Sequence, residues 1–271
     1  MHNWTHYLIT KNEDILDQTL RENKDIIKKI NQHNKILDEI DVVLHKTPDW
    51  IDPCFDLLLY CNLEIEASTF LAMNGYYEDA VALLRIILET SFKKIYTEDI
   101  PFIEDMYYEI FEDLMEKKEK LRKERKWNKE SENQIKRELR ILHPTFKDTV
   151  EYLFQWASVK NFESLRKNKP SFKNEIMALY KSLCSYIHPS KDRAIYAGWD
   201  VKTSSFYLKQ EFQIWSEYYF NTLKILSILL FFIDEELTFN TKNPSKTFLK
   251  IYPKDYELIQ KSINSYLSNK R

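Results

Sequence analysis

The sequence predicts an all-α protein, a helical bundle with a charged helical insertion, and three observations lead to this fold class. The 271 residues include 2 glycines, Gly75 and Gly198, whereas an average chain with about 7% glycine would have roughly 19. All-β folds draw on glycine for their many turns, because glycine adopts positive φ angles freely. Apolar residues recur at three- and four-residue spacing in long segments. Prolines such as Pro53, Pro101 and Pro189 separate these segments, as helix-breaking residues do.

The same scarcity of glycine excludes several function classes. Walker A loops, dinucleotide-binding GxGxxG loops and kinase glycine-rich loops all need several glycines at fixed spacing. Hydrophobic residues make up 44% and charged residues 30% of the chain, a composition typical of globular proteins. The formal net charge is −2, so any contact with a nucleic acid has to involve a local basic patch. No cofactor is predicted.

Cysteine usage and hydropathy predict a cytoplasmic protein without a membrane segment. Cys54, Cys61 and Cys184 show neither metal-site nor redox spacing, and scattered cysteines fit a reducing compartment. The first residues lack the basic region and apolar stretch of a signal peptide. The most apolar run, residues 225–233, is too short to span a bilayer.

A long N-terminal helix is predicted within residues 1–50, from an N-cap at Asn12 to about His45. Asn23 and Asn34 interrupt its apolar stripe at heptad positions. Two interpretations are open: a coiled-coil seam with polar register residues, or an amphipathic helix packed on its own core. The stripe consists of Leu16, Leu20, Ile27, Ile30, Leu37 and Leu44.

Two further helices and a charged insertion follow. Residues 55–73 are apolar on most sides and are predicted to form a buried helix, and residues 77–96 form the next one. Pro101 begins an insertion over residues 101–145, in which an acidic first part is followed by a net basic part with little apolar periodicity. This composition predicts an exposed helix rich in salt bridges, or a mobile arm.

The second half of the chain completes the predicted bundle. Residues 206–236 are very apolar and are predicted to form the central helix. A single domain over residues 1–271 is expected, with its core drawn from residues 53–96 and 171–240. The other predicted elements are helices at 146–159, 171–188 and 253–267 and an extended segment at 247–252.

Arg85 and Glu89 are the first candidate functional residues. They are four residues apart in an otherwise apolar run, so they share a helix face. A charge in apolar surroundings needs a partner, and each residue can supply it to the other. Two interpretations are open: a charged pair that orients a site, or a local ion pair worth a few tenths of a kcal/mol.

A second candidate cluster lies towards the end of the 171–188 helix. Lys181, Cys184 or Ser185, and His188 fall on one helical face. The helix dipole favours a protonated imidazole at this end, whereas the lysine opposes it. His188 is therefore a candidate general acid or base, and the alternative is a histidine that caps the last carbonyls of the helix.

Basic and aromatic residues follow this histidine in the chain. Lys191, Arg193 and Trp199 are candidates for binding single-stranded RNA through charge and stacking, and ordinary packing of an aromatic loop is the alternative. No set of His, Cys, Asp and Glu has the spacing of a zinc site, so no metal site is predicted.

Two segments together resemble bacterial helical proteins of the HEPN superfamily. The first is residues 74–80 leading into Arg85 and Glu89, and the second is residues 180–190, which read YKSLCSYIHPS. HEPN domains are helical bundles, often dimeric, and many are metal-independent ribonucleases of toxin, antiphage and CRISPR-associated systems. The resemblance covers residues 53–96 and 171–233.

The HEPN motif is an arginine followed, after a short spacer, by a histidine at a helix end, and two copies commonly meet across a dimer. Here Lys181 stands at the arginine position, with residues 182–187 between it and His188. Lysine keeps the positive charge but not the bidentate phosphate fork. Either activity is retained with a point charge, or the protein is a non-catalytic interaction module. In the second case the N-terminal helix or residues 101–145 contact a protein partner.

The leading hypothesis is a HEPN-like homodimer that binds or cleaves RNA in a toxin–antitoxin or antiphage defence setting. The resemblance implies that His188 transfers protons to and from an RNA 2′-hydroxyl and phosphate. Lys181 would stabilise the phosphate charge. Arg85, Glu89 and Ser185 would orient the site from the same or the neighbouring helix.

Overall fold

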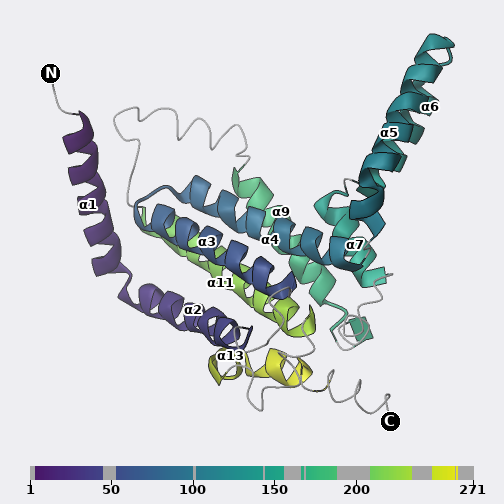
Figure 1. Ribbon diagram of the computed structural model, residues 1–271. Coiled ribbons are helices and arrows are strands. Elements are labelled where there is room, and N and C mark those ends of the chain that lie inside the picture. The colour runs from purple at the N-terminus through teal and green to yellow at the C-terminus, as the bar shows by residue number, and fades with distance from the viewer. Residues whose placement is uncertain are drawn as a thin grey trace.

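The computed structural model describes residues 4–44, 53–99, 102–142, 144–155, 166–167, 169–187, 208–233, 246–259 and 261. These residues are almost entirely helical and contain no strand, which confirms the all-α class (Figure 1). The elements are α1 (Trp4–Glu22), α2 (Lys24–Leu44), α3 (Pro53–Met73), α4 (Tyr77–Asp99), α5 (Phe102–Lys123), α6 (Lys129–Leu142), α7 (Phe146–Gln155), α9 (Phe172–Ile187), α11 (Lys209–Ile233) and α13 (Lys246–Ile251).

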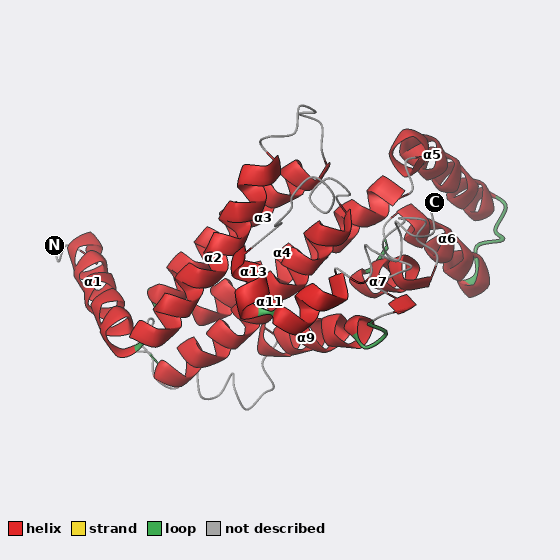
Figure 2. Cartoon of the chain, turned by 90° about the horizontal axis from the view of Figure 1, so that it is seen from below, coloured by secondary structure: helices red, strands yellow, loops and turns green. Residues whose placement is uncertain are grey.

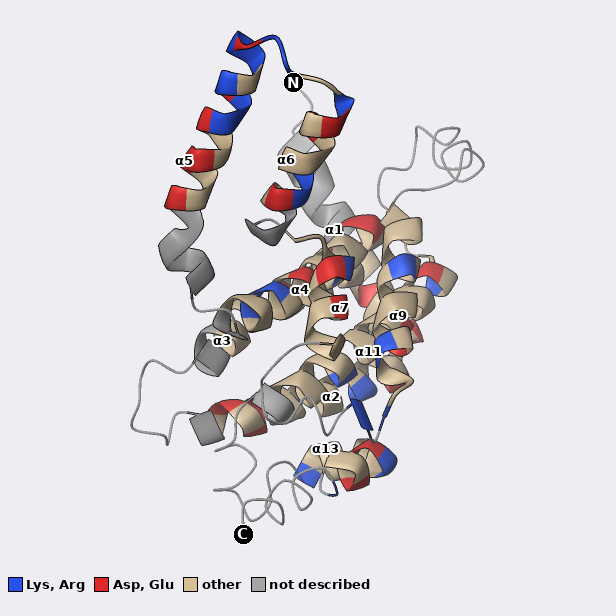
Figure 3. Cartoon of the chain, turned by 90° about the vertical axis from the view of Figure 1, so that its right-hand side faces the viewer, with Lys and Arg blue, Asp and Glu red and all other residues tan. Residues whose placement is uncertain are grey.

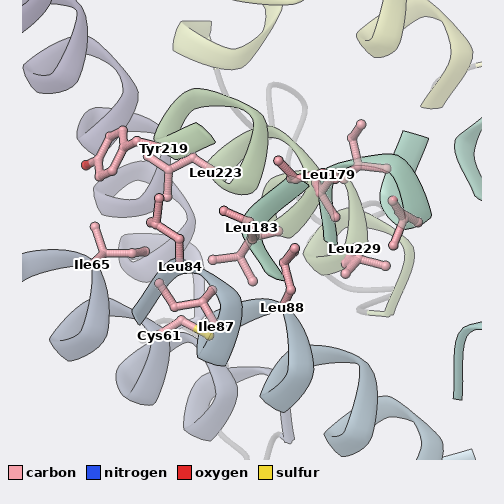
Figure 4. Close-up of a cluster of buried hydrophobic side chains, with 14 of the residues drawn as sticks. Cys61, Ile65, Leu84, Ile87, Leu88, Leu179, Leu183, Tyr219, Leu223 and Leu229 are labelled. Carbon is pink, nitrogen blue, oxygen red and sulfur yellow. The ribbon is translucent and has the colours of Figure 1, made fainter. Parts of the chain in front are cut away.

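Helix α4 lies at the centre of the bundle, because α3, α7, α9 and α11 all pack against it. Figure 4 shows Leu84 and Leu88 of α4 among side chains from α9 and α11, with those of α3 close by. The sequence predicts residues 206–236 as the central helix. α11 does lie in the core, but α4 is the helix that its neighbours surround. The fully buried residues of α4 are Ala80, Val81, Leu84, Ile87, Leu88 and Phe92.

A buried relay of hydrogen bonds ties three of these helices together. The Trp215 indole N–H in α11 donates to the Ser68 hydroxyl of α3 at 3.1 Å. That hydroxyl donates to the backbone carbonyl of Ala80 in α4 at 2.8 Å. Each polar group is thereby satisfied inside the core, which removes the desolvation penalty that an unpaired group would carry.

Helix α3 is covered on only one side. The sequence predicts a helix buried on most sides, but the structure buries Leu58, Cys61 and Ile65 and leaves a second apolar face in solvent. The prediction fails because an apolar helix needs apolar neighbours on every side, and within the described residues this chain supplies them on one. The α3 apolar stripe consists of Tyr60, Leu63 and Phe70, whose exposed fractions are 44%, 62% and 66%.

The predicted N-terminal helix begins before Asn12 and is broken into α1 and α2 at Asn23 (Figure 1). Asn23 is buried, and both its backbone N–H and its side-chain amide donate to the carbonyl of Thr19. An asparagine side chain that bonds a backbone carbonyl competes with regular helix geometry. Ile30 and Leu37 lie in the protein's own core, so α2 follows the amphipathic interpretation rather than the coiled-coil one.

Residues 247–252, which the sequence predicts as extended, belong largely to the short helix α13. Phe248 is fully buried. The Glu39 carboxylate of α2 accepts hydrogen bonds from the Thr247 N–H and hydroxyl, which lie at the start of α13. A carboxylate at a helix N-terminus satisfies free N–H groups and stabilises the helix, and this long-range contact is invisible in the local sequence.

A four-residue ionic network holds the C-terminal part against α9 and α11. Lys169 Nζ lies 2.6 Å from Asp255 Oδ1 and 3.2 Å from Glu175 Oε2. Lys224 Nζ lies 3.2 Å from Asp255 Oδ2 and 4.0 Å from Glu175 Oε2. The Lys169 and Asp255 side chains are only 12% and 17% exposed, so this pair is screened less than a surface pair.

The insertion forms a helical hairpin, α5 and α6, instead of one continuous helix. Figures 1 and 3 show it projecting from the bundle, and Figure 2 shows it at the opposite end of the molecule from α1. Leu114 and Ile135 are buried between the two helices, and Lys117 donates to both oxygens of Glu138 at 3.1 and 3.0 Å. The exposed, salt-bridged character predicted for this segment is confirmed.

We expect Asp255→Asn to lower the free energy of unfolding by about 2 kcal/mol, because it leaves two partly buried ammonium groups with less compensation. Partial burial opposes the charge of Asp255, but Lys169 and Lys224 hold its pKa below the ordinary value. The stabilisation is therefore complete above the ordinary carboxyl pKa, near 3.8, and is lost as the pH falls through the lowered value. Urea unfolding at pH 7 and at pH 3 measures both effects, and an equal loss at the two pH values would contradict the assignment.

Candidate functional site

The contact between α4 and α9 contains a polar cluster of Arg85, Glu89 and Tyr180. Arg85 Nε donates to Glu89 Oε1 at 2.9 Å, and the Tyr180 hydroxyl donates to the same oxygen at 2.6 Å. The Arg85 and Glu89 side chains are 29% and 33% exposed. The ion pair that the i,i+4 spacing predicts is therefore present, and it is shared with a tyrosine from another helix.

The protonation states in this cluster follow from its surroundings. Burial and the hydrogen bond to Glu89 raise the pKa of Tyr180, so its hydroxyl remains a neutral donor at physiological pH. Burial opposes the charge of Arg85, but the hydrogen bond and negative charge of Glu89 raise its pKa overall. The Cys184 thiol also interacts with the Tyr180 hydroxyl. The cluster is a charge-balanced clamp that holds α9 on α4, with one edge open to solvent.

Lys181 and Ser185 lie on a different face of α9. Both are exposed, because consecutive helical residues are turned by about 100° and Lys181 therefore faces away from Tyr180. The Ser185 hydroxyl donates to the Lys181 carbonyl at 2.9 Å. A groove of about 700 Å³ lies beside them, between α9 and α11. It is lined by Ala178, Lys181, Ser182, Ser185, Tyr186, Glu211, Ile214 and Tyr218.

The structure thus divides the candidate residues between two adjoining clusters. Arg85 and Glu89 contact Tyr180, whereas Lys181 and Ser185 line the groove on the next face of α9. Orientation of Lys181 by the Arg85–Glu89 pair would act through the α9 backbone at Tyr180 and not through a direct contact. The remaining candidates, His188, Lys191, Arg193 and Trp199, lie outside the described residues.

Two polar partners in this region have no obvious sign in the sequence. Tyr180 bonds a carboxylate 91 positions away, and Tyr186 donates a hydrogen bond to Glu211 of α11 across one end of the groove. Tyrosine occurs 17 times in the chain, so composition does not single out either residue. The sequence feature that could have identified Tyr180 and Tyr186 is their location in α9, next to Lys181 and Ser185.

His33 is a titratable side chain outside this region. Its Nδ1 lies 2.7 Å from the Lys29 carbonyl, which only accepts, so Nδ1 carries the proton. Its Nε2 therefore accepts from the Tyr252 hydroxyl at 2.8 Å. Burial lowers the pKa of His33, and its ring packs on Phe220 with centroids 4.5 Å apart. This histidine is a neutral packing residue between α2 and the C-terminal part.

Metal-binding clusters and membrane-spanning helices are both absent from the described residues. No group of three or more His, Cys, Asp and Glu side chains among them is placed to hold a metal ion. No helix within the described ranges is both long and apolar enough to cross a membrane.

The sequence of the chain matches one known protein family. The sequence profile of DUF5677, described as a family of unknown function, matches residues 52–198, more than half of the chain. This chain belongs to the DUF5677 family. The family region contains the α4–α9 clamp, Lys181 and Ser185, the α5–α6 hairpin and, by sequence, His188. No curated protein and no solved structure matches the chain. The resemblance to HEPN proteins therefore remains a prediction.

We expect Tyr180→Phe to lower the free energy of unfolding by about 1 kcal/mol, because the hydroxyl donates a short hydrogen bond to a charged carboxylate. Tyr60→Phe is the matched control, since Tyr60 is 44% exposed on α3 and its hydroxyl loss should leave stability unchanged. Guanidinium unfolding of both variants measures the difference. Equal stability of Tyr180→Phe and the control would show that the clamp does not stabilise the α4–α9 contact.

Proposed function

We propose that this DUF5677 protein is a HEPN-like RNA-binding protein whose site is the outer face of α9, and that it cleaves RNA by metal-independent acid–base chemistry. The observation that carries the proposal is the position of Lys181. Its side chain is exposed in the second half of α9, beside a groove of about 700 Å³, and has no ion-pair partner among the described residues. An unpaired exposed cation beside a groove is suited to bind a phosphate group.

The α4–α9 clamp supports this site by fixing the helix that carries it. Glu89 is joined to Tyr180, the residue immediately before Lys181. Rigid helices hold functional side chains more accurately than loops do. Arg85 and Glu89 are therefore positioning residues in the proposal, and Lys181 is the residue that contacts the phosphate.

The proposed reaction is an intramolecular transfer within RNA. His188 takes the proton of the 2′-hydroxyl, and the 2′-oxygen attacks the adjacent phosphorus. The bond from phosphorus to the 5′-oxygen of the next nucleotide breaks, and that oxygen takes up the proton that His188 holds, which returns His188 to its neutral form. The products are a 2′,3′-cyclic phosphate and a 5′-hydroxyl end. The Lys181 ammonium stabilises the extra negative charge on the phosphate oxygens, which is where charge develops in this step.

The proposed biological setting follows from the same resemblance. A helical RNA-cleaving protein of this type would act in the cytoplasm, in a toxin–antitoxin or antiphage defence system. A homodimer would bring two copies of the α9 site into one assembly.

A non-catalytic interaction module is the second candidate, and the α3 apolar stripe favours it. Leu63 and Phe70 are 62% and 66% exposed on a helix whose apolar side chains are not confined to the buried face. An exposed apolar face on a stable helix is typical of a protein–protein interface. A second copy of the chain is the proposed occupant, because a single stripe can pack on itself about a two-fold axis. In this candidate the N-terminal helices or residues 101–145 contact a further protein.

We expect purified wild-type protein to cleave RNA in the presence of EDTA, and His188→Ala to reduce the rate by about a hundredfold or more, because a general acid–base residue contributes on that scale. Lys181→Ala should also slow cleavage, and Lys181→Arg should retain it, because arginine keeps the charge and adds a bidentate fork. Gel analysis of labelled RNA, with mapping of cyclic phosphate ends, is the measurement.

Lys173→Ala is the matched control, since Lys173 lies on the first turn of α9 and away from the groove. It should cleave at the wild-type rate. Equal RNA decay from wild type and His188→Ala, or none from either, would contradict the catalytic proposal.

We expect Leu63→Glu and Phe70→Glu to shift the protein from dimer to monomer, because each places a charge in the proposed apolar interface. Leu249→Glu is the control, since Leu249 is 41% exposed on α13 and lies outside the stripe. Sedimentation velocity at micromolar concentration measures the oligomeric state. A monomeric wild-type protein would rule out the α3 interface.

A further inference from the structure

The α5–α6 hairpin separates its charges along its length. Residues 104–116 contain six acidic and no basic residues, whereas residues 117–129 contain eight Lys and Arg and two Glu. Figure 3 shows mostly red on the lower coloured part of α5 and mostly blue at its far end. Residues 117–129 therefore carry a formal charge of +6, or +4 when Glu130 and Glu132 of the first turn of α6 are included, in a chain whose net charge is −2, which gives this end of the hairpin a positive local field. We call residues 117–129 the hairpin tip.

The hairpin tip is a well-defined turn. At the end of α5, the Lys126 N–H bonds the Leu121 carbonyl at 2.9 Å and the Arg125 N–H bonds the Arg122 carbonyl at 3.1 Å, which is the Schellman pattern. Asn128 Oδ1 then accepts from the N–H groups of Glu130 and Ser131, at 2.9 and 2.8 Å, and caps α6. The basic side chains thus project from a fixed backbone.

Arg125 occupies the position in this turn that glycine normally fills. Its φ angle is 56°, in the left-handed region where a side chain is unfavourable by about 1 kcal/mol. At the matching position after α3, the chain has Gly75, with φ of 83°. An arginine at the hairpin tip therefore keeps a positive charge at the outermost turn at the expense of local backbone stability.

Several tip cations form no ion pair with the described residues. Lys120, Arg125 and Lys129 are exposed, and no carboxylate of the described residues lies within ion-pair distance of them. The Arg122 guanidinium lies over the Trp127 ring, 5.3 Å from its centroid. This contact leaves the guanidinium charge unpaired and places an aromatic ring beside the cations, a combination suited to nucleic acid strands.

We propose that the hairpin tip binds the phosphate backbone of RNA, as a second contact remote from the α9 face. The choice of RNA over other nucleic acids rests on the proposed function. A lipid surface fits less well, because the large exposed apolar side chains of the described residues lie outside α5 and α6 and the one tryptophan of the tip, Trp127, is covered by the Arg122 guanidinium. A regular array of phosphates matches closely spaced cations without apolar contacts.

The test variant combines Lys120→Gln, Arg125→Gly and Lys129→Gln. The matched control combines Lys28→Gln, Lys35→Gln and Lys209→Gln, which removes the same charge from exposed positions on the body. The probes are a fluorescent 20-nucleotide 2′-O-methyl oligouridine and a 20-base-pair 2′-O-methyl RNA duplex, which lack the 2′-hydroxyl needed for cleavage. Fluorescence anisotropy between 50 and 200 mM salt gives the affinity and its salt dependence.

We expect the tip variant to bind at least about tenfold more weakly than the control, and the slope of log K against log salt to fall by about 2 for the single strand. Arg125→Gly alone should weaken binding while leaving the melting temperature unchanged or higher, because glycine adopts this φ without strain. A folding defect would lower the melting temperature, so this single variant separates charge from structure.

Binding by the tip variant that equals the control would overturn the inference, as would binding of anionic vesicles in place of both RNA probes. Its failure is distinguishable from that of the proposed function. If the tip variant still cleaves RNA and binds it with unchanged affinity, the proposed tip contact is wrong and the proposed catalytic function stands. If the tip variant loses RNA binding and the wild-type protein cleaves no RNA, the tip contact is supported and only the catalytic proposal is wrong.

Discussion

Burial of α4 on several sides is the constraint on which the rest of the structure depends. Its apolar side chains face α3, α7, α9 and α11, and burying them supplies a large share of the hydrophobic free energy of the fold. On such a helix, charged side chains can lie only on the narrow strip of surface that remains accessible to solvent. Arg85 and Glu89 lie on that strip, and their partial burial requires partners. Tyr180 meets this requirement from α9, so core packing and the candidate site share one contact.

The packing around α4 also explains why the outer helices carry most of the charged side chains and the exposed apolar surface. Helices around a central one can bury only their inner faces. For α3, whose apolar side chains lie on more than one face, this leaves Leu63 and Phe70 in solvent. For the α5–α6 hairpin, which leaves the bundle after α4 and returns before α7, it leaves nearly every charge exposed. The bundle therefore presents an apolar face and a basic projection in addition to the α9 groove, and each suits a different kind of partner.

The helices themselves could be predicted because their signals are local. Ser171 marks the start of α9 and Gly75 the end of α3, as the structure confirms. The sequence-based helix boundaries are wrong where a distant contact or a single backbone angle determines where a helix begins or ends. Asn23 divides α1 from α2 through its bonds to the preceding turn, and Arg125 turns the chain without glycine. The residues that form α13 depend on Glu39, about 200 positions earlier in the chain.

The sequence by itself determined the all-α class, most of the helix positions and the Arg85–Glu89 pair, because each depends on neighbours within one or two helical turns. Only the tertiary structure decided that Glu89 also binds Tyr180, that Lys181 lines a groove with α11, and that α3 keeps an uncovered face. These features depend on which helices meet and at what rotation about their axes. Packing of the whole core sets that rotation, and no local pattern in the sequence encodes it.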